Sequence, residues 1–140
     1  MIYFNYENDF VLENEEVISS WLEAVIASEK KKLGEINYIF CDDEYLHKIN
    51  LEYLSHDTLT DIISFDYSVG SELNGDIFIS VERVIENASD FNTEFNDELK
   101  RVLVHGILHY CGFKDKSEED EQLMRSKEDE KIQMFHVKHS

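Results

Sequence analysis

The sequence predicts a mixed α/β domain whose elements follow the order β-α-β-α-β-β-α-α-α. Four short segments have the apolar alternation or the β-branched and aromatic content typical of strands, namely residues 2–6, 36–40, 60–65 and 76–80. Five longer segments repeat apolar residues at helical spacing. With 140 residues, 42% of them hydrophobic, the chain can bury a core of its own, so we expect one domain, residues 1–140.

The first strand and the first helix follow from residues 2–34. Residues 2–6 alternate apolar and polar side chains and predict the opening strand. A helix should follow, with Asn14 at its N-cap and with Lys30–Lys32 and Gly34 closing it. Its apolar face is formed by Val17, Ile18, Trp21, Leu22, Val25 and Ile26.

The middle of the chain is expected to hold a short helix and a hairpin. After the strand at residues 36–40, Asp42 and Asp43 can cap a helix. The apolar residues of that helix are Leu46, Ile49 and Tyr53. Residues 55–59 are polar and predict a loop. The turn-rich segment 70–75 should join the last two strands as a hairpin.

Three helices are expected in the C-terminal half. The first carries four apolar residues at helical spacing, Val81, Val84, Ile85 and Ala88. The second follows Asn92 and Thr93 and contains two histidines. The third should begin at Ser117, with Asp120 completing its cap, and run to about Phe135 as an acidic, solvent-exposed helix.

The second of these helices carries a candidate metal site. His105 and His109 are four residues apart, so in a helix both imidazoles leave the same face about 6 Å apart along the axis. Two neutral imidazoles in that relation can bind one divalent cation at about 2.0–2.1 Å. Gly112 permits the left-handed residue that ends many helices, after which Asp115 is the natural third ligand.

Other readings of this stretch stay open on the residues alone. The histidines could be packed or capping side chains, although burying both without a partner is costly. If Asp115 only caps the helix or faces solvent, His139, Asp76 or a second water must complete the site. A zinc peptidase of the H-E-x-x-H type is disfavoured, because Gly106 stands where its general base would be.

Composition limits location and partners. Thirteen basic and thirty-one acidic residues give a net charge of −18, which repels nucleic acid over most of the surface, although a local positive site can coexist with it. Cys41 and Cys111 form no disulfide or zinc pattern and predict a reduced, cytoplasmic protein. We expect neither a signal peptide nor a membrane partner, since no apolar run approaches the ~18–20 residues of a span.

Three blocks of the sequence resemble the YbeY family of metal-dependent endoribonucleases. Residues 105–115 read HGILHYCGFKD and resemble its signature H-G-x-L-H-x-x-G-Y-D-H. Residues 50–53 with 60–65 resemble its N-x-x-Y and T-D-V-L-S-F block, and residues 75–80 resemble its G-D-I-x-I-S strand. The resemblance implies a four-stranded mixed sheet and one bound zinc, with no organic cofactor. It also implies 3′-end maturation of small-subunit ribosomal RNA and ribosome quality control, with that RNA and the small ribosomal subunit as partners.

Two departures from the family pattern concern the site. The third family histidine is Asp115 here, and Leu54 stands where the family has an arginine. Arg101 or Lys114 could supply the missing charge, so the expected catalytic residues are His105, His109 and Arg101. The alternative is a ribosome-assembly or binding factor with a structural metal. A fourth protein ligand would indicate that alternative, whereas an open position would indicate catalysis.

Overall fold

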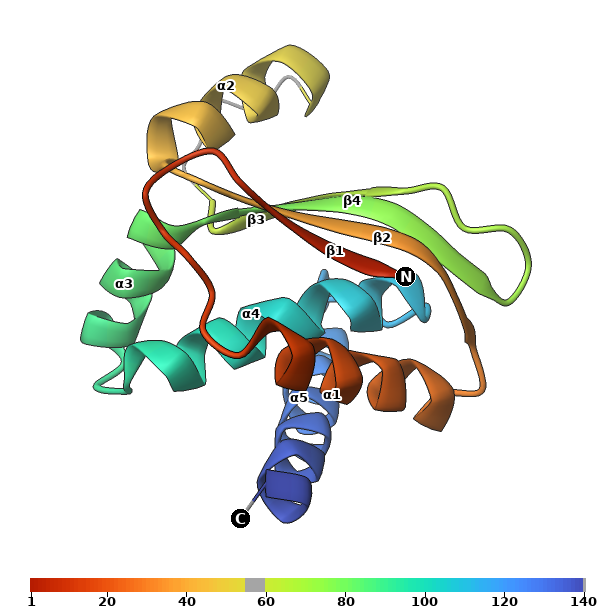
Figure 1. Ribbon diagram of the computed structural model, residues 1–140. Coiled ribbons are helices and arrows are strands. Elements are labelled where there is room, and N and C mark those ends of the chain that lie inside the picture. Colours follow the sequence, from red (N-terminus) through yellow and green to blue (C-terminus); the bar gives the residue numbers. More distant parts are fainter. Residues whose placement is uncertain (55–59, 140) are drawn as a thin grey trace.

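The computed structural model describes residues 1–54 and 60–139 (Figure 1). The loop expected at residues 55–59 lies outside the described residues. Across the rest, the order of elements confirms the prediction: β1 (Ile2–Tyr6), α1 (Glu15–Ser28), β2 (Lys32–Cys41), α2 (Asp43–Leu54), β3 (Ile62–Asp66), β4 (Glu72–Ser80), α3 (Val81–Asp90), α4 (Phe95–Tyr110) and α5 (Glu118–His139).

The strands form one mixed sheet in the order β1-β2-β4-β3. β2 pairs in parallel with both β1 and β4, so Tyr38 lies beside Phe4 on one side and Ile77 on the other. β3 pairs antiparallel with β4, which confirms the expected hairpin. The α/β fold with a four-stranded mixed sheet is therefore as predicted.

The end of α1 differs from the prediction. The helix stops at Ser28, and Lys30 adopts the left-handed conformation with φ of 59°, so that the Lys31 N–H donates to the Ile26 carbonyl. Lys32 and Gly34 therefore lie in β2 and do not close the helix. Asn14 occupies the N-cap position without a side-chain cap bond, whereas the expected cap at Ser117 does accept from the Asp120 N–H at 3.0 Å.

Two other element boundaries, the start of β4 and the end of α5, also differ from the prediction. β4 begins at Glu72, inside the segment expected to be the turn, because Val69 and Glu72 exchange backbone hydrogen bonds and close the hairpin earlier. α5 continues past Phe135 to His139. Within the described residues, we find no helix with the length and apolarity that a membrane span requires.

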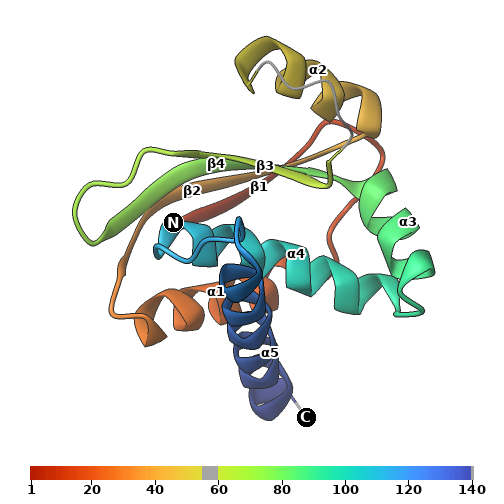
Figure 2. The ribbon, with the colours of Figure 1, turned by 180° about the vertical axis from the view of Figure 1, so that it is seen from behind.

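The helices are divided unequally between the two faces of the sheet. α1, α4 and α5 lie on one side and α2 on the other, with α3 at one end (Figures 1 and 2). Buried strand residues meet buried α4 residues in the core between the layers, namely Ile36, Tyr38, Ile77, Ile79, Leu103, Ile107 and Leu108. The Tyr38 hydroxyl donates to the Leu103 carbonyl at 2.7 Å, which ties α4 to the sheet.

α5 packs against α4 and α1 on the side away from the sheet (Figure 2). The Trp21 indole N–H donates to the Lys131 carbonyl at 2.8 Å. The Lys131 ammonium is 4% exposed and pairs with the Glu29 carboxylate at 2.6 Å. Burial raises the pKa of Glu29, but hydrogen bonds from Lys131 and Lys127 outweigh it and hold that pKa below its usual value. These contacts fix α5 against α1 and so position its inner face beside α4.

Candidate metal centre

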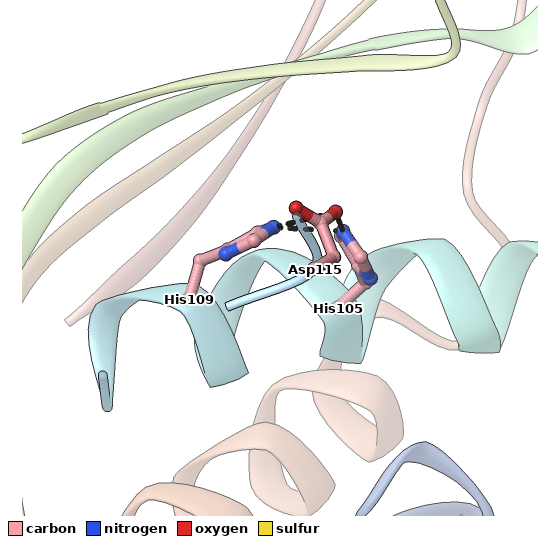
Figure 3. Close-up of side chains that lie close together, drawn as sticks. All are labelled: His105, His109 and Asp115. Carbon is pink, nitrogen blue, oxygen red and sulfur yellow. Dashed lines mark hydrogen bonds and ion pairs between the residues drawn. The ribbon is translucent and has the colours of Figure 1, made fainter. Parts of the chain in front are cut away.

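The two histidines leave the margin of a buried helix. The rest of α4 around them is core, since Leu103, Gly106 and Ile107 are buried. The side chains of His105 and His109 remain 19% and 29% exposed. Their spacing of four residues brings them to the same side of the helix, and the two Nε2 atoms are 2.9 Å apart (Figure 3). The expected histidine pair is thus formed.

A glycine turn returns the chain over this pair. Gly112 has φ of 104°, a conformation that costs a side-chain-bearing residue about 1–2 kcal/mol. Its N–H donates to the His109 carbonyl at 3.0 Å, and the Phe113 N–H donates to the Leu108 carbonyl at 3.1 Å. This pair of bonds is a Schellman motif. It reverses the chain, so that Asp115 lies over the two imidazoles (Figure 3).

Three ligand atoms converge from these residues. Asp115 Oδ2 lies 3.3 Å from Nε2 of His105 and 3.3 Å from Nε2 of His109. A tetrahedral metal with bonds of about 2.0–2.2 Å holds its ligand atoms about 3.3 Å apart. Two sides of the triangle therefore have the length expected in such a coordination sphere, and the third side, between the two Nε2 atoms, is shorter at 2.9 Å.

The other ring nitrogens fix the tautomers. His109 Nδ1 lies 2.9 Å from the Phe113 carbonyl, which can only accept, so His109 Nδ1 carries the hydrogen. His105 Nδ1 lies 2.7 Å from the carboxylate of Glu128, which is likewise an acceptor. Each neutral ring then presents the lone pair of Nε2, and two such lone pairs meet a carboxylate oxygen. This donor set fits a divalent cation.

Negative charge surrounds the triangle. Burial lowers the pKa of His105, but the hydrogen bond to Glu128 and the nearby carboxylates of Asp115 and Asp61 outweigh it and raise that pKa above its usual value. The same field that favours a proton on the imidazole favours a metal cation beside it. Glu128 is 5% exposed and comes from α5, 23 residues after His105.

Among the side chains described, those of residues 1–54 and 60–137, no fourth histidine, cysteine or acidic residue joins the group of His105, His109 and Asp115. Asp76, one of the alternative ligands, accepts from the Asn37 amide at 3.2 Å and is not part of the group. The side chain of His139, the other alternative, lies outside the described residues. A set of three protein ligands leaves a coordination position open, as in catalytic sites.

The triangle borders a cavity of about 440 Å³. Its lining includes acidic and polar residues that sequence reasoning did not single out, namely Asp61, Asn87, Glu98, Arg125 and Glu128. Burial raises the pKa of Asp61 and of Glu98, and the neighbouring Glu128 carboxylate raises both further. Asp61 also raises the pKa of Glu98. Only Asp61 had a sequence signal, because it belongs to the second resemblance block.

The two basic residues expected to supply positive charge, Arg101 and Lys114, lie in different surroundings. Arg101 lines the cavity, but its guanidinium pairs with Glu128 at 2.8 Å and with Asp129 at 2.7 Å. Lys114 is exposed on the segment after α4. Leu54, at the family arginine position, ends α2 and is 41% exposed. The catalytic role expected of Arg101 stays a prediction.

The comparisons with known proteins show which family this chain belongs to. The family described as Endoribonuclease YbeY matches residues 3–136. The chain belongs to the YbeY family. Endoribonuclease YbeY of Flavobacterium johnsoniae is 74% identical over 137 residues, covering 98% of this chain and 99% of that protein. The YbeY of Flavobacterium psychrophilum is 65% identical and covers 99% of both chains.

A solved structure shares the fold. The solution structure of a Thermotoga maritima protein matches with a TM-score of 0.66 and 25% identity, covering 99% of this chain and 93% of that one. Together with the family match, this likeness confirms the resemblance to YbeY and the fold that it implied.

Exchanging Glu128 for glutamine should weaken metal binding although none of the three candidate ligands is replaced. Glu128→Gln removes the charge that orients His105 and raises the basicity of its Nε2, and we expect about a 10–100-fold loss of metal affinity. Competition with a chromophoric chelator measures this loss. Asp129→Asn is the matched control, because Asp129 pairs with the same arginine but does not contact His105. Equal losses in the two variants would contradict the orienting role.

Proposed function

We propose that this chain is a metal-dependent endoribonuclease that acts in 3′-end maturation of small-subunit ribosomal RNA and in ribosome quality control. The observation that carries the proposal is the convergence of His105, His109 and Asp115 on one point beside a cavity, with no fourth ligand among the described residues. The name of the relatives supports ribonuclease chemistry. The ribosomal substrate and the small subunit as partner rest on the family resemblance, and the cytoplasmic location rests on the two cysteines, which form no disulfide pattern.

The ligand set favours zinc. Two imidazoles and one carboxylate are among its preferred ligands, and His105, His109 and Asp115 would hold it. Bound there, the metal would lower the pKa of a water and polarise a phosphodiester oxygen. The carboxylate ligand also admits harder metals such as Mn²⁺ more readily than three histidines would.

The chain's own residues prepare the site in two further ways. Glu128 and the Phe113 carbonyl hold the two rings so that both Nε2 atoms face the metal position. Arg101 binds the second oxygen of Glu128, so we assign it to positioning that carboxylate. The cavity beside the triangle provides room for a nucleotide next to the reacting centre.

The test combines metal analysis with RNA cleavage. Purified protein is analysed for bound metal, and the loaded protein is incubated with single-stranded and structured oligoribonucleotides, with His109→Ala as the control. We expect one metal per chain and internal cleavage that is lost in the variant. Full metal occupancy without cleavage would overturn the enzyme proposal and leave the alternative of a binding factor with a structural metal.

A further inference from the structure

Two cavities meet at the metal centre. The first, of about 440 Å³, runs toward β3 and α3, and the second, of about 610 Å³, runs along α5. Four residues line both of them: His105, Asp115, Arg125 and Glu128. A polynucleotide that enters one cavity and leaves by the other must therefore pass these four side chains.

The lining of both cavities is strongly acidic. Its carboxylates are Asp61, Glu98, Asp115, Glu118, Glu121 and Glu128. A phosphodiester carries one negative charge, and at close range its repulsion from several carboxylates is large where the dielectric constant is low. A single metal with a carboxylate ligand offsets only part of this repulsion. RNA binding at this centre therefore needs a cationic side chain in the same place.

Two arginines line the first cavity, and they differ in how they are held. Arg101 is bound by the carboxylates of Glu128 and Asp129. Arg125 is exposed and, among the residues that the structure describes, forms no ion pair. Only Arg125 of the two also lines the second cavity.

The position of Arg125 on α5 directs it toward the metal centre. It precedes Glu128 by three residues, so the two side chains share one face of the helix. Glu128 on that face reaches His105 Nδ1 at 2.7 Å. The guanidinium of Arg125 thus projects from the element that already supports the metal ligands.

Resting on the proposed function, we propose that Arg125 is the side chain that binds the RNA phosphate beside the metal ligands, where the two cavities join. A guanidinium suits this task, because its planar N–H groups donate to two phosphate oxygens at once. Arg125 supplies positive charge from α5 to a lining whose other charged side chains, apart from Arg101 and the histidines, are acidic.

The test compares Arg125→Gln, Arg125→Lys and Lys48→Gln in the metal-loaded full chain. Lys48 is the charge-matched control, because it is exposed on α2, on the opposite face of the sheet. Metal content, kcat/KM on a single-stranded oligoribonucleotide, and the salt dependence of oligonucleotide binding are measured. We expect Arg125→Gln to keep its metal and to lose about 100-fold in kcat/KM. The plot of log binding constant against log salt concentration should become less steep, its negative slope smaller in magnitude by about 0.7.

The controls separate this inference from the function itself. Arg125→Lys should keep the salt slope and recover part of the activity, and Lys48→Gln should match the parent. If Arg125→Gln cleaves and binds RNA as the parent does, the inference is wrong and the proposed function stands. If the parent binds RNA without cleaving it, the proposed function fails. The salt dependence of binding in Arg125→Gln and in the parent then tests the role of Arg125 by itself. If the parent does not bind RNA, both fail.

Discussion

Replacing His105 or His109 with alanine should abolish stoichiometric metal binding and leave the fold largely intact. The loss should exceed the roughly 10–100-fold expected for an outer partner, because a ligand itself is removed. Both imidazoles are partly exposed, while the apolar face of α4 that holds the core does not depend on them. Elemental analysis and thermal unfolding followed by circular dichroism measure the two effects. One metal per chain in either variant would show that the site is misplaced.

Variants of Asp115 test how much this third candidate ligand contributes to metal affinity compared with His105 and His109. Asp115→Ala should weaken metal binding less than loss of either histidine, because the two imidazoles remain fixed by Glu128 and the Phe113 carbonyl. Asp115→His should keep the metal and prefer zinc more strongly. It should also move a pH–rate profile to lower pH, because a neutral ligand leaves more charge on the metal. Parent-like affinity in Asp115→Ala would exclude Asp115 as a ligand.

Gly75→Ala should cost about 3 kcal/mol or more of the free energy of unfolding. Gly75 lies in β4, and a Cβ there would overlap both the Tyr110 hydroxyl and the Phe65 carbonyl. These two groups form a 2.8 Å hydrogen bond that joins the end of α4 to β3. The extra methyl group has to displace backbone or break this bond, and urea denaturation measures the result.

Gly70→Ala is the control for Gly75→Ala. Gly70 has φ of 60° but nothing within 4 Å of the position where its Cβ would be. Its substitution therefore reports backbone strain alone, about 1–2 kcal/mol. Equal losses of stability in the two variants would mean that the sheet accommodates the methyl group at Gly75.

The features that depend on residues close together in the sequence could be predicted from the sequence. The spacing of His105 and His109 and the glycine at position 112 define the centre within eleven residues, so helical geometry and one turn suffice to bring Asp115 back. The order of elements was equally accessible, because each strand and helix carries its own periodicity.

Contacts between residues far apart in the sequence could not be predicted in the same way. Glu128 reaches His105 only because α5 packs against α4, and no local pattern in an acidic helix marks which glutamate will turn inward. Arg125 was missed for the same reason. The end of α1 was misjudged because Lys30 adopts a backbone conformation usually given to glycine, which residue preferences do not predict.

The link between His105 and α5 makes the order of synthesis matter for this centre. All three candidate ligands precede residue 116, yet the carboxylate that orients the first of them lies at position 128. A nascent chain released up to Asp115 would carry the complete ligand set with one ring free to rotate. We therefore expect full metal affinity only after α5 has folded onto α1 and α4, so that bound metal would indicate a chain whose C-terminal helix is in place.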